Sequence, residues 1–349
     1  MTSKFIKDIL SDPLEAVRRT RHPIGYLGLD IPLDILLAYQ GGVVHLPWTP
    51  DMVTPFADNW LESGFAPWTR SILEAWHRGE FDFLERVIFS RGSDNIQRLY
   101  YYICELQSRG VLAGPTAEIF DVAKIQRPTS LARNAEAVEK LCAVLKIDRE
   151  ALAGGIKKAN VIRRKLADKL EHRSGAGASW EQLSRALLFA DPQDVLEHFE
   201  VDEKIGGRRL ILAGSVPPDD RIHQIIDRSG WTVIDEFHDG SLHHYGPAVT
   251  VAEEGEITAL AKHIHQSSHG PRSFSNLSDR LLRRVDEQKP EAVILWMIEE
   301  DETLVWELPK QVAALEKAGI PYLALTRRNW LFNDSAGDEI RRFLEGVKK

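Results

Sequence analysis

Three polar corners directly follow apolar, strand-like runs, and they hold residue types that could do chemistry. They are RGSD at 91–94, AGS at 213–215 and IEEDE at 298–302. In an open parallel sheet, ligands gather at the carboxyl ends of the strands, where a hydroxyl or carboxylate can bind them or move a proton. Serine and aspartate also cap helices and fill loops. Ser93 and Asp94 are therefore compatible with a nucleophile, a helix cap or the remnant of a lost site.

Two further stretches are rich in titratable groups. Adjacent carboxylates at 299–302 raise one another's pKa, so one of them could act as an acid; the alternative is an acidic loop at a helix N-terminus. Several histidines lie between residues 238 and 269, a stretch that we interpret as a loop: His238, His243, His244, His263, His265 and His269. Imidazoles can bind zinc or iron, but neither HExxH nor CxxC occurs, so a hydrogen-bonded loop without metal is favoured.

The elements that must position these residues follow from the hydrophobic pattern. Strand-like runs alternate with helical ones from residue 24 to about 128 and again from 207, whereas the period is helical from 130 to about 200. This alternation predicts an α/β fold of two Rossmann- or flavodoxin-like parallel-sheet domains with an inserted helical segment. The expected division is an N-terminal docking helix at 1–23, a first domain at 24–128, the helical segment at 129–206 and a second domain at 207–349.

Composition excludes several classes of function. The 349-residue chain has a formal net charge of -8 with scattered basic residues, so neither nucleic acid nor an anionic membrane is expected as a partner. No signal-peptide pattern opens the sequence, and we expect a cytoplasmic protein. The two cysteines, Cys104 and Cys142, lie in apolar helical patterns as small hydrophobes. Two cysteines cannot hold an iron–sulfur cluster without other ligands. No GxGxxG, P-loop or GxSxG motif occurs.

The order of these segments resembles the subunits of 2-hydroxyacyl-CoA dehydratases and benzoyl-CoA reductases from Gly25 to the end. GYLGLDIPLDILLAYQGGVVHLP is similar to that family's opening strand, helix and strand, with Asp34 where glutamate is usual. GFAPWTRSIL, VIFSRGSDNIQRLYYY and VILWMIEEDETLVWELPKQVAALEKAGIPYLAL resemble the three segments that carry its cluster-ligand cysteines. The candidates for lining a cleft between the two α/β domains are Arg70, Asp94 and Arg98 in these segments and Ser215 in the AGS corner.

The resemblance implies a [4Fe-4S] cluster that delivers an electron to an acyl-CoA thioester. Here the three ligand positions read Ala66, Ser93 and Asp301, or Glu300 with a shift of one residue, and His238 stands where a further cysteine is usual. Alanine offers no ligand, and hydroxyl and carboxylate oxygens are hard ligands that do not suit such a cluster. We therefore expect this chain to bind no cluster and no metal, with Glu300 and Asp301 capping a helix.

Three functional hypotheses remain. Since family enzymes are heterodimers of related chains, this chain would be a non-redox subunit that shapes an acyl-CoA site beside a cluster-bearing paralogue. Alternatively it is a stand-alone enzyme with Glu300, Asp301 and His238 as acid–base residues, or a regulatory or scaffold protein. Association with itself or a paralogue is also expected from Trp48, Trp60 and Trp68, which lie in loop-like segments; the alternative is core packing. Ala66, Ser93 and Asp301 should converge on one cleft between the domains.

Overall fold

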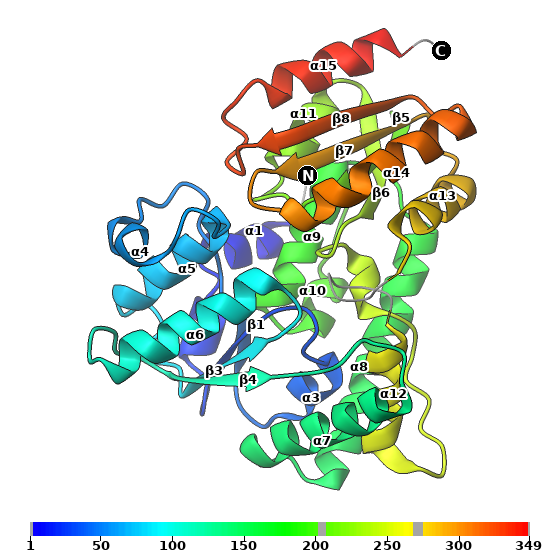
Figure 1. Ribbon diagram of the computed structural model, residues 1–349. Helices are drawn as coiled ribbons and strands as arrows, with labels where there is room; N and C mark the ends of the chain where they lie inside the picture. The colour runs from blue at the N-terminus through cyan, green and yellow to red at the C-terminus, as the bar shows by residue number, and fades with distance from the viewer. Residues whose placement is uncertain (1–2, 202–206, 268–274, 348–349) are drawn as a thin grey trace.

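The structure is a computed structural model that describes residues 3–201, 207–267 and 275–347. It contains two four-stranded sheets in which every strand pairing is parallel (Figure 1). The first sheet has the order β2-β1-β3-β4 and the second the order β6-β5-β7-β8. The strands are β1 Ile24–Leu27, β2 Val43–His45, β3 Arg86–Ser90, β4 Thr116–Phe120, β5 Arg208–Gly214, β6 Trp231–Phe237, β7 Ala292–Ile298 and β8 Tyr322–Arg328. The predicted α/β class with two parallel sheets is confirmed.

Both sheets follow the strand order of a flavodoxin-like fold, with the first strand of each unit near the centre. The central strands are apolar because helices cover both of their faces. All seven residues of β7, AVILWMI, are buried, and so are all four of β1. The edge strand β8 has three polar residues at its end, TRR, and is only partly buried.

Four helices belong to the first sheet: α3 Leu33–Ala38, α4 Pro55–Trp60, α5 Pro67–His77 and α6 Asp94–Ser108. Proline stands in the first turn of α4 and α5, where its missing N–H has no helical partner to lose. The N-terminal residues form two short helices, α1 Lys4–Ser11 and α2 Glu15–Arg18. Ile6 of α1 is fully buried against the helical segment, which fixes the start of the chain to the interior.

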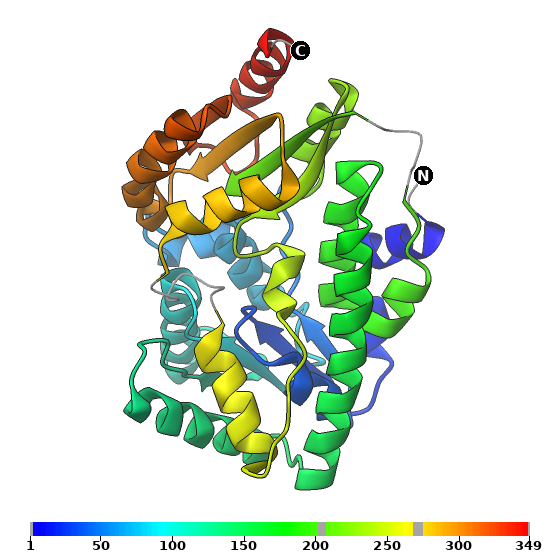
Figure 2. The same cartoon turned by 90° about the vertical axis from the view of Figure 1, so that its right-hand side faces the viewer.

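The helical segment comprises α7 Pro128–Val144, α8 Arg149–Glu171, α9 Gly177–Phe189 and α10 Pro192–Glu197. Figure 2 shows it, in green, alongside both sheets. Helix α8 packs on α3 of the first part, while α9 contacts β2 of the first sheet and β6 of the second. The segment therefore joins the two sheets instead of separating them.

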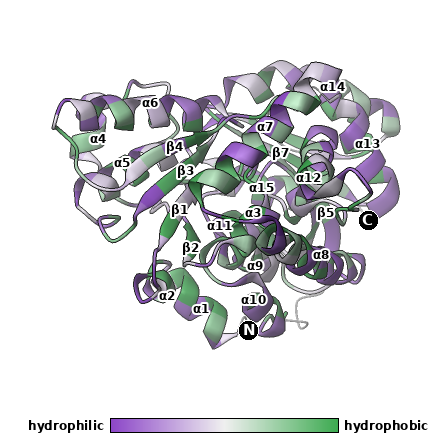
Figure 3. Cartoon of the chain, turned by 90° about the horizontal axis from the view of Figure 1, so that it is seen from below, coloured by the Kyte–Doolittle hydropathy of each residue, from purple (hydrophilic) through white to green (hydrophobic). Residues whose placement is uncertain are grey.

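The second sheet is accompanied by α11 Arg221–Arg228, the 3-10 helix η1 Leu242–Tyr245, α12 Gly255–Gln266, α13 Leu277–Gln288, α14 Glu302–Ala318 and α15 Ala336–Gly346. Asn276 caps α13 by accepting from the N–H groups of Ser278 and Asp279. Most helices carry both hydrophobic and hydrophilic residues, as amphipathic covering helices do (Figure 3). In the described residues, no helix has the length and apolar character needed to cross a membrane.

The interpretation of residues 238–269 as one loop is wrong, because η1 and α12 lie within it. Helix α12 packs against α7, and its Leu260 and Ile264 join the core beneath the first sheet together with Val249. The apolar positions 259, 260, 261 and 264 follow helical spacing and are the sequence signal for this helix. The histidines at 263 and 265 were interpreted as possible metal ligands in a loop, and the helical pattern was missed. Residues near 249–264 thus extend from the second sheet back onto the first.

A buried ion pair connects three distant parts of the chain. Arg163 of α8 donates to both carboxylate oxygens of Asp34 in α3, at 2.8 and 2.6 Å, and neither side chain is more than 4% exposed. The Arg163 Nε also donates to the carbonyl of Tyr245, 2.9 Å away. Asn160, one turn earlier in α8, exchanges two hydrogen bonds with the backbone of Val249. The α3–α8 contact and the chain at 245–249 are therefore held by one polar network.

The tryptophans that were expected in loops pack into the interior. Trp60 ends α4 and Trp68 lies in α5, so the placement of these two in loops is wrong. Trp48 and Trp68 contact the cores of both sheets, and the Trp48 indole donates to the carbonyl of Pro218 at 2.8 Å. These side chains stabilise the contact between the two parts of the chain, and association with another chain stays a prediction.

Replacing Asp34 by Ala should lower the free energy of unfolding by about 3–5 kcal/mol, because the Arg163 charge would remain buried without its partner. Arg163→Ala should have a similar effect. Denaturant unfolding followed by circular dichroism measures both. The matched control is Arg19→Ala, which removes an exposed ion pair with Glu15 and should change stability by less than about 1 kcal/mol. Equal effects of the buried and exposed substitutions would contradict this role of the pair.

Candidate functional site

Both sheets reverse their strand order at one point, and the polar corners lie there. The chain moves outward from β1 to β2 and then returns to β3 on the other side; β5, β6 and β7 repeat this path. The carboxyl ends of β1 and β3 lead into Asp30 and into the corner at 91–94, and those of β5 and β7 lead into Ser215 and Glu299. Such switch points leave a crevice at the end of a parallel sheet, which is where ligands bind in these folds.

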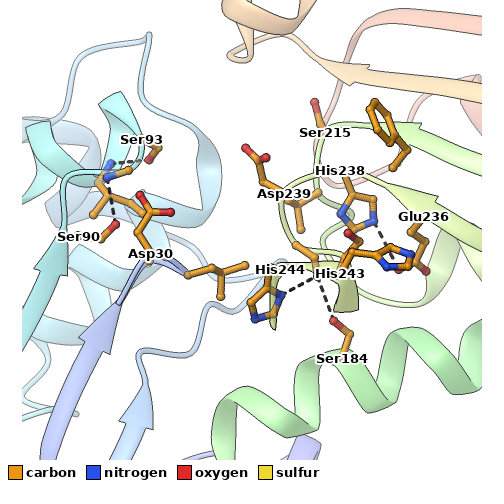
Figure 4. A pocket seen from close by; sticks show the side chains of 18 of the residues that line it. Asp30, Ser90, Ser93, Ser184, Ser215, Glu236, His238, Asp239, His243 and His244 are labelled. Atoms are coloured by element: carbon orange, nitrogen blue, oxygen red, sulfur yellow. Dashed lines mark hydrogen bonds and ion pairs between the residues drawn. The ribbon is translucent and has the colours of Figure 1, made fainter. Parts of the chain in front are cut away.

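A single cavity of about 1600 Å³ lies where these crevices meet. Figure 4 shows Asp30, Ser90 and Ser93 on one side of it and Ser215, His238 and Asp239 on the other. The helical segment adds a third wall with Glu181, Ser184 and Arg185, and α13 contributes Arg280, Arg283 and Arg284. Its volume exceeds the roughly 300–1,000 Å³ typical of sites for small ligands.

The first wall is built from the end of β3 and the start of α6. Ser93 caps α6, since its hydroxyl accepts a hydrogen bond from the N–H of Ile96 at 3.1 Å. Ser90 accepts from the N–H of Gly92, also at 3.1 Å, and this closes the corner. Asp94 and Arg98 follow on α6 and line the cavity, where Arg98 pairs with Glu62 at 2.6 Å. The cap is thus the role that the structure gives Ser93.

Ala66 and Arg70 lie behind this wall and do not line the cavity. Ala66 is fully buried, packs against the core of the second sheet, and donates its N–H to the Asn95 side chain at 3.0 Å. This bond ties the start of α5 to the start of α6, two residues after Ser93. Arg70 donates to the carbonyl of Glu62 at 2.6 Å and pairs with Asp58 at 2.9 Å. Of the three ligand positions, Ser93 and Asp301 therefore share the cavity.

The second wall is held by Ser215. Its hydroxyl accepts from the N–H of Ile298 at 3.1 Å and is hydrogen-bonded to Asp301, so it joins the ends of β5 and β7. Asp301 stands at the N-cap position of α14, but its side chain makes no capping hydrogen bond. The expectation that Asp301 caps this helix is therefore wrong. Burial raises the pKa of Asp301, and the Ser215 hydroxyl partly offsets this effect.

Glu300 faces the same cavity, and its Oε2 is buried without a hydrogen-bonding partner among the described residues. Burial raises the pKa of Glu300, and the neighbouring carboxylates Glu299 and Asp301 add to the effect. The expected mutual influence of the acids at 299–302 is therefore seen at Glu300 and is smaller than the effect of burial.

A buried acid–base cluster lies at the base of the cavity and consists of Glu181, His223, Glu236 and His238. Of these four residues, the sequence interpretation found only His238. His223 of α11 is hydrogen-bonded to Glu236 of β6 at 2.8 Å, and Arg173 lies 3.5 Å from the same carboxylate. Both lining acids, Glu181 and Glu236, are at most 4% exposed. Two signals were available: consecutive acids inside the strand WTVIDEF, and one acid within the otherwise buried face SWEQLS of α9.

The two carboxyls of this cluster have opposite properties. Burial raises the pKa of Glu181 to about 8, and the charge of Glu236 adds to this. Burial acts in the same direction on Glu236, but His223 and Arg173 outweigh it and hold the pKa of Glu236 well below its usual range. Burial opposes the charged form of His223, and Glu236 raises its pKa nonetheless. At neutral pH, Glu181 is therefore protonated, whereas Glu236 is ionised and paired with His223.

The remaining histidines of residues 238–269 lie outside this cluster. His243 pairs with Asp235 at 2.7 Å, and Arg284 holds the other oxygen of Asp235 at 2.7 Å. His244 bonds to the carbonyl of Ser241, while His263 and His265 are on α12. His269 lies outside the described residues. Within the described ranges, no three His, Cys, Asp or Glu side chains are grouped so that they could hold a metal ion.

A family model described as 2-hydroxyglutaryl-CoA dehydratase, D-component, matches residues 30–329. The chain belongs to this family. No curated protein matches it. Among solved structures, a periplasmic heme-binding protein from Pseudomonas aeruginosa is similar over 94% of each chain, at 12% identity and a TM-score of 0.25. So slight a likeness carries no argument about fold or function.

The residues of this dehydratase-family member do not fit the cluster that the family resemblance implies. Cys104 is half-buried on α6, Cys142 is buried in the core beneath the first sheet, and neither lines the cavity. Of the positions where cysteine was expected, Ser93 caps a helix, Ala66 is enclosed by apolar side chains and Asp301 is bound to Ser215. An iron–sulfur cluster requires thiolates at most of its corners.

The contribution of Glu181 to the stability of the chain should fall as pH rises from about 4.5 to about 8. A carboxyl with a raised folded pKa stabilises the fold below its unfolded pKa, and this contribution is lost as pH rises through the folded value. Glu181→Gln keeps a neutral amide there and should gain stability relative to the unmodified chain from about pH 5 to about pH 8, with a constant difference above that pH. Denaturation midpoints measured from pH 5 to 9 test this, with Glu200→Gln on the exposed surface as the control. Parallel profiles for all three proteins would contradict the assignment.

Proposed function

We propose that the chain is a non-redox subunit related to 2-hydroxyacyl-CoA dehydratases, pairing with a cluster-bearing paralogue and shaping an acyl-CoA site. The observation that carries this proposal is the state of the ligand positions. The cavity at the two switch points is large and open to a ligand, yet Ala66, Ser93 and Asp301 are each engaged in local structure. An architecture that keeps the cavity without the thiolates suits substrate binding without electron transfer.

The chemistry of one rim supports an acyl-CoA ligand. Arg280 and Arg283 lie on the same side of α13 and both line the cavity. Burial lowers the pKa of Arg280, the charge of Asp239 partly offsets this, and the neighbouring charge of Arg283 adds to the lowering. Phosphates relieve such repulsion, and guanidinium groups bind them in a bidentate manner. The apolar residues Leu166, Leu170 and Leu188 line the same cavity, where an acyl chain could pack.

Pairing with another subunit is supported by Trp306. This side chain of α14 is 81% exposed, and the first turn of the same helix lines the cavity. Tryptophan is enriched at protein interfaces, so an exposed one beside the cavity suits a partner that covers its mouth.

The purified chain should acquire no iron–sulfur cluster. After anaerobic incubation with iron and sulfide and removal of excess reagents, metal analysis and visible absorption should show less than stoichiometric iron, since the cavity lacks thiolate ligands. A cluster-bearing family member treated in parallel is the positive control. Four iron atoms per chain with the absorption of a [4Fe-4S] centre would refute the non-redox assignment.

Butyryl-CoA should bind the chain, and Arg283→Gln should weaken its binding about tenfold, as expected for the loss of a charge-assisted contact with phosphate. Calorimetric titration at two salt concentrations measures this, and the variant should also show a weaker salt dependence. Arg109→Gln is the matched control, because Arg109 is an exposed arginine at the far end of α6.

If butyryl-CoA binds neither the chain nor its complex with a paralogue, the acyl-CoA site is refuted. A scaffold protein without a ligand would then be the better description. Binding of butyryl-CoA with turnover by the chain alone would instead favour a stand-alone enzyme.

A further inference from the structure

Of the four edge strands in the described part of the chain, three are protected against pairing with another strand. Strand β8 has an irregular register with β7, places Arg327 at a φ of 53° and ends in the residues TRR. Strand β6 also has a register shift, and β2 has only three residues and contacts α9. Irregular backbone, charged ends, short length and covering helices are the usual means by which natural sheets avoid edge-to-edge association.

Strand β4 is the exception. It is the outer strand of the first sheet (Figure 1), its register with β3 is unbroken, and its sequence TAEIF carries a single charge. Among the described elements, β3 and α6 make its main contacts. The first four residues of β4 keep some exposed surface, whereas every residue of the central strand β1 is buried. The first sheet therefore has one open edge, at β4.

The hydrogen bonds of β4 show which of its backbone groups face outward. The N–H of Thr116 and the carbonyl of Phe120 are bonded to the residues that flank β3. Because backbone groups alternate in direction along a strand, Thr116, Glu118 and Phe120 face β3, while Ala117 and Ile119 face the other way. In the described residues, no hydrogen bond is made to the N–H or C=O groups of Ala117 and Ile119. Four groups at this spacing match the edge of another β-strand.

We propose that β4 is a self-association edge, at which two copies of the chain pair their β4 strands antiparallel about a two-fold axis at Glu118. In this register Ala117 of each copy exchanges two hydrogen bonds with Ile119 of the other copy, so all four outward groups are satisfied. The two first sheets then form one continuous sheet, and the symmetry is closed, as in most homodimers. The inference is independent of the acyl-CoA site, which lies at the ends of the strands and not along this edge.

The side chains at the edge favour a second copy over an unrelated strand. In the proposed register the small Ala117 lies opposite the larger Ile119 of the other copy, on one face of the sheet, so each pair combines a small with a large side chain. Val111 before β4 and Ile125 after it are 39% and 44% exposed. Antiparallel pairing brings the start of one strand beside the end of the other, so the segment that carries Val111 approaches the one that carries Ile125.

Glu118 gives self-pairing a signature of its own. On the two-fold axis the two Glu118 side chains lie directly opposite each other, and like charges in this arrangement are destabilising. Arg86 of β3 lies 3.7 Å from each carboxylate, and its charge reduces the repulsion. The association should therefore be weak, and removing the charge of Glu118 should strengthen it. Pairing with a strand that has no acid at this place would not respond in that way.

The test is sedimentation of the full chain over a wide range of protein concentration, where the unmodified chain should show a monomer–dimer equilibrium. Ala117→Pro should weaken dimerisation at least about tenfold, because it removes two of the four hydrogen bonds between the copies. The deleted N–H has no partner within the chain, so the fold should tolerate proline there, and circular dichroism verifies this. Glu118→Gln should strengthen dimerisation about two- to fivefold.

Oxidative cross-linking tests the register. Glu118→Cys should give a disulfide-linked dimer, because the Cα atoms of such a pair lie about 4.5 Å apart, within the range of a disulfide. Thr116→Cys is the matched control on the same strand and should give none, since its two copies would lie roughly 14 Å apart. The unmodified chain, with Cys104 and Cys142, is the background control.

Three results would overturn the inference: a monomer at every concentration, a dimer that Ala117→Pro leaves intact, or equal cross-linking at positions 116 and 118. A dimer that is lost in Trp306→Ala and kept in Ala117→Pro would place the interface on α14 instead. Binding of butyryl-CoA is measured separately, so failure of the edge pairing leaves the proposed acyl-CoA site standing.

Discussion

The ion pair of Asp34 and Arg163 is the constraint on which the arrangement of the two sheets depends. Two charges removed from water must be paired and hydrogen-bonded almost completely, and this pair satisfies the condition with the Tyr245 carbonyl as a further acceptor. The geometry allows few alternatives: α3 of the first part, α8 of the helical segment and the chain near 245 must meet at one place. A hydrophobic contact would tolerate sliding of α8 along α3, and this network does not.

The cavity follows from that constraint. Once α8 is fixed on α3, the next helix, α9, is placed between β2 and β6. The start of α9 is anchored by Asp227, whose carboxylate accepts from the N–H groups of Gly177 and Ala178 at 3.0 Å. The same helix carries Glu181 beneath the carboxyl ends of the second sheet. The helical segment is therefore a wall of the site, and the acid it contributes is protonated because the two sheets close over it.

The sequence predicted those features that depend on local pattern. Uniformly apolar runs such as AVILWMI mark central parallel strands, and the corner after VIFS marks a helix start, so both sheets and the capping serine could be anticipated. Features that depend on tertiary contacts could not be predicted in this way. Helix α12 returns to the first sheet, Trp48 joins two cores, and Glu181 meets Glu236 across 55 positions of sequence; none of these pairings leaves a periodic signal.

The positions where the family resemblance places cysteine are occupied by residues that take part in the local hydrogen bonding and packing of the cavity frame. Strand ends and helix starts define the cavity, and these depend on backbone hydrogen bonds, not on a metal. Ser93 supplies one of these bonds as a cap, Asn95 connects two helix starts through the N–H of Ala66, and Ser215 joins β5 to β7. Ser93 stands at one of the expected ligand positions, whereas Asn95 and Ser215 form hydrogen bonds with the other two, Ala66 and Asp301. These small polar side chains therefore hold the frame of the cavity through local hydrogen bonds.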